Sequence, residues 1–280
     1  MPAFTNQALL TYNNNRTALS NIANGNISEP FVMTKRAVNN DYVSNDDVTY
    51  VVTITNSSVA ALTNVTFTDN LGAYPYGPVP ITLYPLTFVG PVLYYVNGVP
   101  LANIVPTQTT PTLILTIPSI PALGNATLVY EVNVNRYAPL GVQDTIVNTA
   151  GITELTGISA TATIVTEDIP QLAITKSISP NPIIDNQTAT YTFIIENYGN
   201  TASTDVVLTD TFNPILSNVT ASVDGNPLVL NTDYTYNAGT GVLATITGRL
   251  TVPPGTITQD SNGVVKVTPG SIILVVTGTI

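Results

Sequence analysis

The chain repeats itself at a constant spacing of 141 residues, and this constrains its fold more than any other feature. The segment Phe31–Lys35 (Phe-Val-Met-Thr-Lys) recurs as Leu172–Lys176 (Leu-Ala-Ile-Thr-Lys). Without a gap, the same spacing relates three further pairs: Tyr50 and Tyr191, Asn56 and Asn197, and Thr68-Asp69 and Thr209-Asp210. Four landmarks at one spacing predict two copies of a single folded unit.

The residues between these landmarks alternate between apolar and polar, which is the pattern of half-buried β-strands. Val48, Tyr50, Val52 and Ile54 alternate with mostly polar neighbours, and Ala189–Ile195 does the same in the second repeat. Only 9% of the residues are charged, and no segment shows a long helical period. β-Branched residues suit a pleated surface, so we predict an all-β protein of two tandem β-sandwich domains, each with its own core.

The two repeats end differently. Both contain a hairpin-turn dipeptide, Asn97-Gly98 and Asp224-Gly225, and both later contain a strand that follows a glycine, Gly124 to Val134 and Gly270 to Ile280. The first repeat then continues into another predicted strand, residues 144–152. The second stops at Ile280, so we expect its sandwich to lack the last strand.

The first residues of the chain resemble this final strand. Phe4–Leu10 follows the pattern of Ile146–Ile152 (apolar-x-Asn-x-Ala-x-apolar), and Ser20–Glu29 resembles Ser159–Glu167. A sandwich without an edge strand exposes apolar surface and unpaired backbone groups, which strand addition from another chain would cover. We therefore predict a donor strand for the second domain of another subunit, formed by Phe4, Asn6, Ala8, Leu10 and Tyr12.

Two other fates of this N-terminal arm stay open. It can fold back onto the second domain of its own chain, or it can be disordered. Exchange between subunits differs from both because a head-to-tail contact that does not close on itself produces an open filament. The partner that we expect is therefore another copy of the same chain.

Three polar residues of each repeat share a strand face with core residues. Lys35 is in phase with Phe31 and Met33, and Lys176 is in phase with Leu172 and Ile174. The same argument applies to the acidic and amide residues. It directs Asp69 and Asn148 into the first domain, and Asp210 and the arm residue Asn6 into the second.

This arrangement has two interpretations. In one, Lys and Asp form a buried ion pair to which Asn is hydrogen-bonded, although burial offsets most of the attraction between the charges. In the other, burial favours the neutral amine, which attacks the Asn carboxamide while Asp transfers protons, so that ammonia leaves and an isopeptide bond forms. The bonds would be Lys35–Asn148 within the first domain, with Asp69, and Lys176–Asn6 between subunits, with Asp210.

Composition excludes several other classes. The chain has no Cys, His or Trp, so we expect no conventional nucleophile–base pair, no zinc site, no cofactor and no enzyme beyond autocatalytic cross-linking. Its net charge of −10 disfavours nucleic acid. The start lacks the pattern of a secretory signal, and no apolar run is long enough to span a membrane.

Two local features have a structural and a functional interpretation. The acidic pair Asp46-Asp47 precedes a predicted strand and is typical of a solvated turn, while Asp41 to Asp47 lacks the spacing of a calcium loop. The Tyr- and Pro-rich stretch from Tyr74 to Tyr95 has no equivalent of this form in the second repeat. It is either a plain loop insertion or a lateral contact or ligand surface.

The chain resembles a known family in these motifs. Thr175-Lys176, the Asn181-Pro182 region, Tyr191 and Asn197, then Val206 to Asp210 and Asn148 to Ala150, are similar to the conserved-repeat domains found in tandem on bacterial and archaeal surface proteins. The resemblance covers both repeats and the arm. It implies an immunoglobulin-like sandwich and a cell-surface role. The chain is also similar to pilins and adhesins with isopeptide bonds between their first and last strands, and to spore-surface appendage subunits.

Together these observations predict four segments: a donor-strand arm (1–29), a first sandwich domain (30–153), a connector (154–170) and a second sandwich domain (171–280) without its last strand. The function that we expect is that of a structural subunit of an extracellular fibre on a cell or spore surface. The alternative is a monomeric surface adhesin or carbohydrate-binding module.

Overall fold

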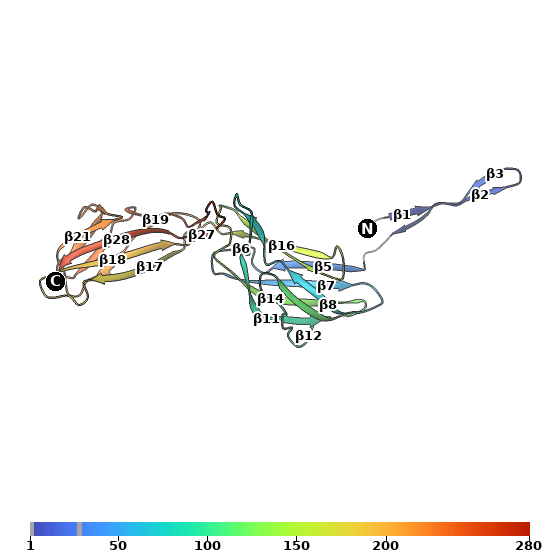
Figure 1. The fold of residues 1–280 in the computed structure, drawn as a ribbon, viewed down its shortest axis with the longest axis horizontal. Helices are drawn as coiled ribbons and strands as arrows, with labels where there is room; N and C mark the ends of the chain where they lie inside the picture. The colour runs from blue at the N-terminus through green and yellow to red at the C-terminus, as the bar shows by residue number, and fades with distance from the viewer. Residues whose placement is uncertain (1–2, 27–29) are drawn as a thin grey trace.

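The structure is a computed structural model that describes residues 3–26 and 30–280 (Figure 1). Every regular element in these residues is a β-strand, so the predicted all-β class is confirmed. No helix that is long and apolar enough to cross a membrane occurs in the described part of the chain. The strands form two separate hydrophobic clusters and an arm that projects from one end (Figure 1).

The first sandwich, residues 31–166, consists of two five-stranded sheets, in the orders β12-β11-β14-β7-β5 and β13-β8-β15-β16-β6. Alternate side chains of the strands meet between the sheets, where Tyr50, Phe67 and Leu128 are buried. Residues 159–166 of the predicted connector form β16 and thus belong to this sheet. The strands are β5 Phe31–Ala37, β6 Asp41–Tyr42, β7 Asp47–Asn56, β8 Leu62–Asp69, β11 Leu86–Val96, β12 Val99–Pro100, β13 Leu113–Ile120, β14 Gly124–Val134, β15 Thr145–Ile152 and β16 Ser159–Thr166.

A short hairpin, β9 (Tyr74–Tyr76) and β10 (Ile81–Leu83), lies between β8 and β11. It belongs to the Tyr- and Pro-rich stretch and is directed toward the second sandwich, as described below.

The second sandwich, residues 172–280, has one five-stranded sheet in the order β17-β18-β28-β21-β22. The other face is made of the pair β19-β25 and the three strands β20-β24-β23, and β26-β27 forms a separate two-stranded sheet. Phe193, Leu243 and Leu274 are among its core residues. The strands are β17 Leu172–Ser179, β18 Thr188–Asn197, β19 Ser203–Val206, β20 Thr209–Thr211, β21 Ser217–Val223, β22 Asn226–Pro227, β23 Tyr234–Asn237, β24 Val242–Thr245, β25 Leu250–Val252, β26 Thr256–Gln259, β27 Val265–Thr268 and β28 Gly270–Thr279.

The spacing of 141 residues is retained in the strand pairing. Lys35 lies opposite Val52 in the β5–β7 pair, and Lys176 lies opposite Phe193 in the β17–β18 pair. Both predicted hairpin turns are confirmed as well. Asn97 and Gly98 have φ angles of 48° and 79°, and Asp224 and Gly225 have φ angles of 47° and 80°, as a type I′ turn requires.

The asparagines that recur in the two repeats are hydrogen-bonded to the turn that follows their strand. Asn56 Nδ2 donates to the carbonyl of Ala60 at 2.8 Å, and Asn197 Nδ2 donates to the carbonyl of Thr201 at 2.8 Å. Both residues are fully buried. The asparagine landmark therefore reflects a buried backbone that needs a hydrogen-bond partner.

The arm, residues 3–26, is a two-stranded hairpin. β1 (Ala3–Asn6) pairs with β4 (Ala23–Asn26), and β2 (Leu9–Tyr12) pairs with β3 (Arg16–Leu19). The prediction of one continuous strand from Phe4 to Leu10 is therefore wrong, because the pairing register shifts by one residue between the two halves of the hairpin.

The second sandwich contains no counterpart of β15 and β16 among its described residues. In the first sandwich β16 packs against β5, and Met33 and Lys35 on β5 are buried. Every residue of β17, the counterpart of β5, is exposed instead. The missing cover leaves the apolar side of β17 in solvent, including Leu172, Ile174 and Ile178.

Candidate functional site: two lysine–aspartate clusters and an acceptor groove

The first cluster is closed inside the first sandwich. Lys35 on β5 and Asp69 at the end of β8 meet across the two sheets, with Nζ and Oδ2 2.6 Å apart and both side chains fully buried. The Tyr130 hydroxyl, from β14, donates to the same carboxylate oxygen. The other oxygen accepts the backbone N–H of Leu71 at 2.8 Å. Asp69 is thus held by three donors in a site without water access.

Burial makes the Lys35 amine easier to deprotonate than that of an ordinary lysine. Burial lowers the pKa of the Lys35 amine from 10.5 to about 8, although the Asp69 carboxylate acts in the opposite direction. The ammonium also lies over the Tyr50 ring, 4.7 Å from its centroid. Burial likewise raises the pKa of the Tyr130 hydroxyl well above its usual value, so Tyr130 donates its proton to Asp69 without losing it.

Asn148 on β15 is fully buried in the same region. Its neighbour on the same face, Ala150, pairs directly with Asp69. The Asn148 Oδ1 atom accepts the backbone N–H of Gly72 at 3.3 Å, whereas its Nδ2 atom is buried without a hydrogen-bond partner. The Tyr50 hydroxyl faces this side chain and also has no partner with good geometry. A buried amide nitrogen without a hydrogen-bond partner lowers the free energy of unfolding by about 1–3 kcal/mol.

The second cluster has the same lysine and aspartate but is open. Lys176 Nζ lies 2.5 Å from Asp210 Oδ2, and the two side chains are 41% and 18% exposed. The ammonium lies over the rings of Tyr191, Phe193 and Phe212, at 5.0–5.4 Å. No asparagine reaches this pair within the described residues.

The structure therefore groups the predicted residues unequally. It brings Lys35, Asp69 and Asn148 into one buried region, and it brings Lys176 to Asp210 but leaves Asn6 far away. Asn6 lies in the arm, on the side of the first sandwich that faces away from the second (Figure 1). Phe4, Ala8, Leu10 and Tyr12 are exposed in the same arm.

Two contributors to the first cluster were not predicted. Tyr130 lies opposite Tyr50 in the β14–β7 pair, and Val276 takes the equivalent place opposite Tyr191. Because this tyrosine is absent from the second repeat, the comparison of repeats could not identify it. Gly72 contributes only its backbone N–H, which residue type does not reveal.

A groove runs beside the second cluster. β20 pairs only with β24 and β19 only with β25, so within residues 172–280 the other edge of each strand has no partner. Between these edges and β17 lies a depression of about 290 Å³. We call it the acceptor groove; it is lined by Leu172, Ala173, Ile174, Ile195, Val206, Val207, Leu208 and Thr209.

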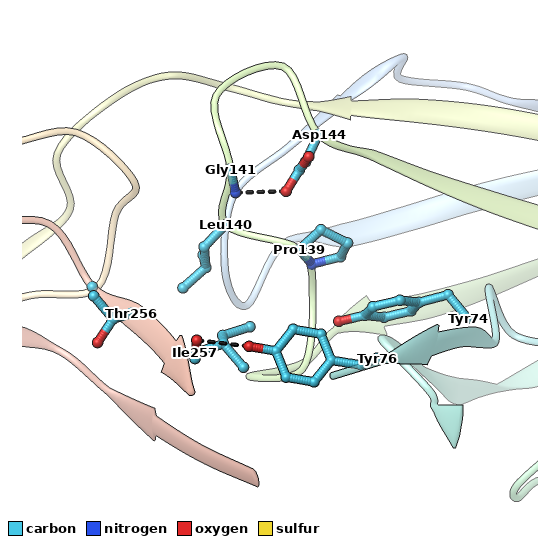
Figure 2. A pocket seen from close by; sticks show the side chains of 9 residues that line it. Tyr74, Tyr76, Pro139, Leu140, Gly141, Asp144, Thr256 and Ile257 are labelled. Atoms are coloured by element: carbon cyan, nitrogen blue, oxygen red, sulfur yellow. Dashed lines mark hydrogen bonds between the residues drawn. The ribbon is translucent and has the colours of Figure 1, made fainter. Parts of the chain in front are cut away.

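The Tyr- and Pro-rich stretch forms a joint between the two sandwiches (Figure 2). The Tyr76 hydroxyl donates to the carbonyl of Ile257 in β26 at 2.7 Å, and the Tyr74 hydroxyl donates to the carbonyl of Tyr137 at 2.7 Å. Gln259 donates to the Val79 carbonyl at 2.8 Å and accepts the Val79 N–H at 3.1 Å. Both tyrosine hydroxyls are thus used within the chain, which favours a structural role over a ligand surface.

The acidic segment before β7 is a turn, as predicted. Asp46 Oδ2 accepts the backbone N–H of Val43 at 2.9 Å, and Asp47 is the first residue of the strand. Across residues 3–26 and 30–280, acidic side chains do not gather in a group of three or more that would hold a metal ion.

No protein-family model and no curated protein matches the chain. Among solved structures it is similar to BcpA, the major pilin subunit of Bacillus cereus, with a TM-score of 0.38 and 11% identity over 95% of this chain and 77% of BcpA. It is also similar to the pilus backbone RrgB from Streptococcus pneumoniae, with a TM-score of 0.34 and 13% identity over 85% of this chain and 49% of RrgB. A third similar structure is AvmM, which catalyses macrocyclization in alchivemycin A biosynthesis, with a TM-score of 0.30 and 9% identity over 51% of this chain and 92% of AvmM. At these TM-scores and identities the similarities do not assign a function to the chain.

Proposed function

We propose that the chain is the structural subunit of an extracellular fibre, assembled head-to-tail when the arm of one copy completes the second sandwich of the next. One observation carries this proposal: the arm repeats the buried side of β15 and β16, and the second sandwich exposes a groove where those strands would lie.

The correspondence extends to individual side chains. Ile146, Asn148, Ala150 and Ile152 are the inward residues of β15, and all four are buried at 4% exposure or less. Their counterparts in the arm are Phe4, Asn6, Ala8 and Leu10. These are exposed, with Phe4 at 53% and Leu10 at 62%. An arm with a core-like face but no core favours insertion into another chain.

Association would remove several unfavourable features at once. The apolar side of β17 and of the arm would leave water, and the free edges of β19 and β20 would gain backbone partners. The arm projects from the side of the first sandwich that faces away from the second sandwich (Figure 1), and the acceptor groove belongs to the second sandwich. A contact between them therefore repeats from copy to copy and extends a filament.

We also propose that Lys35 and Asn148 form an isopeptide bond. The neutral Nζ of Lys35 attacks Cγ of Asn148, while Asp69 accepts a proton from the amine and returns it to Nδ2. The Gly72 N–H supports the developing negative charge on Oδ1. The C–Nδ2 bond breaks and ammonia leaves, so the unpartnered amide nitrogen is removed from the core.

The same chemistry would link neighbouring subunits. Docking of the arm would bring Asn6 to Lys176 and Asp210 and would cover the exposed lysine, so the second bond can form only after assembly. The location on a cell or spore surface belongs to the same proposal. It is supported by the resemblance of both repeats to surface-protein domains.

The assembly proposal is tested by a matched pair of substitutions. Leu9 and Leu10 are adjacent and both 62% exposed, but only Leu10 is on the face that corresponds to buried Ile152. Leu10→Asp would place an unpaired carboxylate in the groove and should give monomers. Leu9→Asp should still give filaments in negative-stain micrographs and size-exclusion chromatography. Equal assembly of both variants would contradict strand insertion.

The covalent part has a separate readout. Intact mass should fall by one ammonia for each bond, and boiled samples should show a ladder of covalent multimers. Asp210→Ala should keep the filaments but abolish the ladder, whereas Asp69→Ala should keep the ladder and lose only the internal bond. Clean monomers of full calculated mass after boiling the parent protein would remove the isopeptide proposal and leave assembly intact.

A monomeric adhesin or carbohydrate-binding module is the competing function. It predicts a stable monomer whose ligand binding is unaffected by removal of residues 1–12. Filament formation that depends on those residues excludes it.

A further inference from the structure

The arm is a preformed hairpin of two strands, and its β1–β4 half, at the base of the arm, has the pairing register of β15 and β16. Phe4 lies opposite Gly25 and Asn6 opposite Ala23, just as Ile146 lies opposite Ile164 and Asn148 opposite Ala162. We propose that the acceptor groove binds both strands of the arm of a second copy, in the register that β15 and β16 use. This inference rests on the proposed function and specifies its interface.

The register follows from the first sandwich. There, β15 pairs with β8 through Ala150 opposite Asp69 and Ile152 opposite Phe67. Transferred to the second sandwich, Ala8 lies opposite Asp210, Leu9 opposite Thr209 and Leu10 opposite Leu208. Asn6 then lies on the same face as Ala8, two residues along, where Asn148 lies relative to Lys35 and Asp69.

The second strand of the arm covers what a single strand cannot. In the first sandwich it is β16, the second strand of the β15–β16 pair, that packs against β5. Its inward residues Ala162 and Ile164 are buried. The arm places Ala23 and Gly25 at these positions, so β4 would lie over β17 and shield Ile174, which is 57% exposed in the single chain.

The arm and the β15–β16 pair differ at one inward position. Where β15 and β16 pair two isoleucines, the arm pairs Phe4 with Gly25. The Phe4 ring occupies the space that a Cβ atom on Gly25 would need. A larger residue on one strand is thus compensated by the smallest residue on the other, which keeps the hairpin suited to a core.

The tip of the arm has an additional function. Sixteen residues separate Asn6 from Ala23, whereas thirteen separate Asn148 from Ala162. The extra three residues lengthen the β2–β3 hairpin beyond the point at which β15 ends. In the proposed register Tyr12 lies opposite Val206, so that Leu10 and Tyr12 fill the depression of about 290 Å³ beside β17.

Disulfide trapping tests the register, because the natural chain has no cysteine. The variant carries Leu9→Cys and Thr209→Cys, which are outward-facing and should lie about 5.5 Å apart between Cα atoms. Lys176→Arg is added to remove the proposed isopeptide bond at that site. Oxidation should give a ladder of multimers that disappears on reduction. The control variant carries Thr11→Cys and Thr209→Cys, which are two residues out of register. It should give at least tenfold less disulfide-linked multimer.

The second strand is tested by two substitutions that change the charge equally. Ala23→Asp places a carboxylate on the inward face of β4, and Asn24→Asp places one on its outward face. Because burial of an unpaired carboxylate costs several kcal/mol, Ala23→Asp should reduce disulfide trapping by at least tenfold while Asn24→Asp leaves it unchanged.

The outcomes separate the two proposals. In-register trapping that Ala23→Asp abolishes supports a two-stranded donor. If the out-of-register cysteine pair gives more disulfide-linked multimer than the in-register pair, or if Ala23→Asp does not reduce trapping, the inference is overturned while the fibre function stands. Parent protein that remains monomeric overturns both.

Discussion

At the level of single residues, Lys35 and Lys176 occupy equivalent positions but have different surroundings. Both were predicted to point inward from the alternation of their strands, and the Lys35 side chain is buried. Lys176 points the same way but is partly solvated, because no strand covers β17. The direction of a side chain follows from the periodicity of its own strand, whereas its burial depends on strands far away in the sequence.

The depressed pKa of Lys35 leads to a prediction for a protein that lacks the bond. In Asn148→Ala, the folded state holds the Lys35 proton less tightly than the unfolded state, whose lysine pKa is near 10.4. Between about pH 8 and pH 10 the unfolded state therefore binds more protons, and stability rises with pH. Across this pH range the free energy of unfolding of Asn148→Ala should rise by about 3 kcal/mol more than that of the reference variant Lys35→Met/Asn148→Ala, which has no lysine at this position. Urea denaturation at each pH measures both. Parallel pH curves for the two variants would contradict it.

The buried asparagines give a second prediction at this scale. Asn197 accepts the N–H groups of Gln171 and Gly199, both at 2.9 Å, and donates to Thr201. Asn197→Ala should lower the free energy of unfolding of the second sandwich by about 3 kcal/mol, since buried groups would lose their partners. Asn226→Ala, on an exposed strand, is the control and should change it by less than about 0.5 kcal/mol. The measurement is urea denaturation in the Leu10→Asp background.

At the level of elements, strand existence was predictable but the arm's internal pairing was not. Residues 124–134 form one strand, β14, as predicted, because a long alternating segment determines its own conformation. The arm was predicted as one strand, yet it is split into β1 and β2. The split lies where the register changes by one residue between the β1–β4 and β2–β3 pairs, and this register depends on the partner strand as well as on the arm's first strand.

The same dependence on two strands gives a prediction for the arm. Gly25→Ile alone would collide with the Phe4 ring and should impair assembly. Phe4→Ile together with Gly25→Ile recreates the Ile146–Ile164 pair of the first sandwich and should restore filaments to near parent levels. Filament yield by sedimentation is the measurement. Failure of the double variant to recover would show that the arm does not occupy a site like that of β15 and β16.

At the level of the whole molecule, the two sandwiches are related by the repeat but connected by a feature outside it. The β9–β10 hairpin lies in the stretch that the repeats do not share, so comparing them could not show that it contacts β26 (Figure 2). Gln171 also donates to the Ser44 carbonyl at 3.2 Å, and Asn200 donates to Asp168 at 2.6 Å. Sandwiches in tandem without such contacts would move independently.

In the proposed fibre, the joint between the two sandwiches of one chain would influence how the filament bends. Every subunit would contribute one joint within the chain and one between chains, and only the first includes the hydrogen bonds of Tyr76 and Gln259. Tyr76→Phe with Gln259→Ala removes three hydrogen bonds across it. The persistence length of filaments in micrographs should fall by roughly a factor of two, because small interdomain interfaces permit motion unless they are reinforced. Thr258→Ala, which alters only the β26–β27 pair, should leave the persistence length unchanged. Equal stiffness of all three fibres would mean that bending occurs at the joint between chains instead.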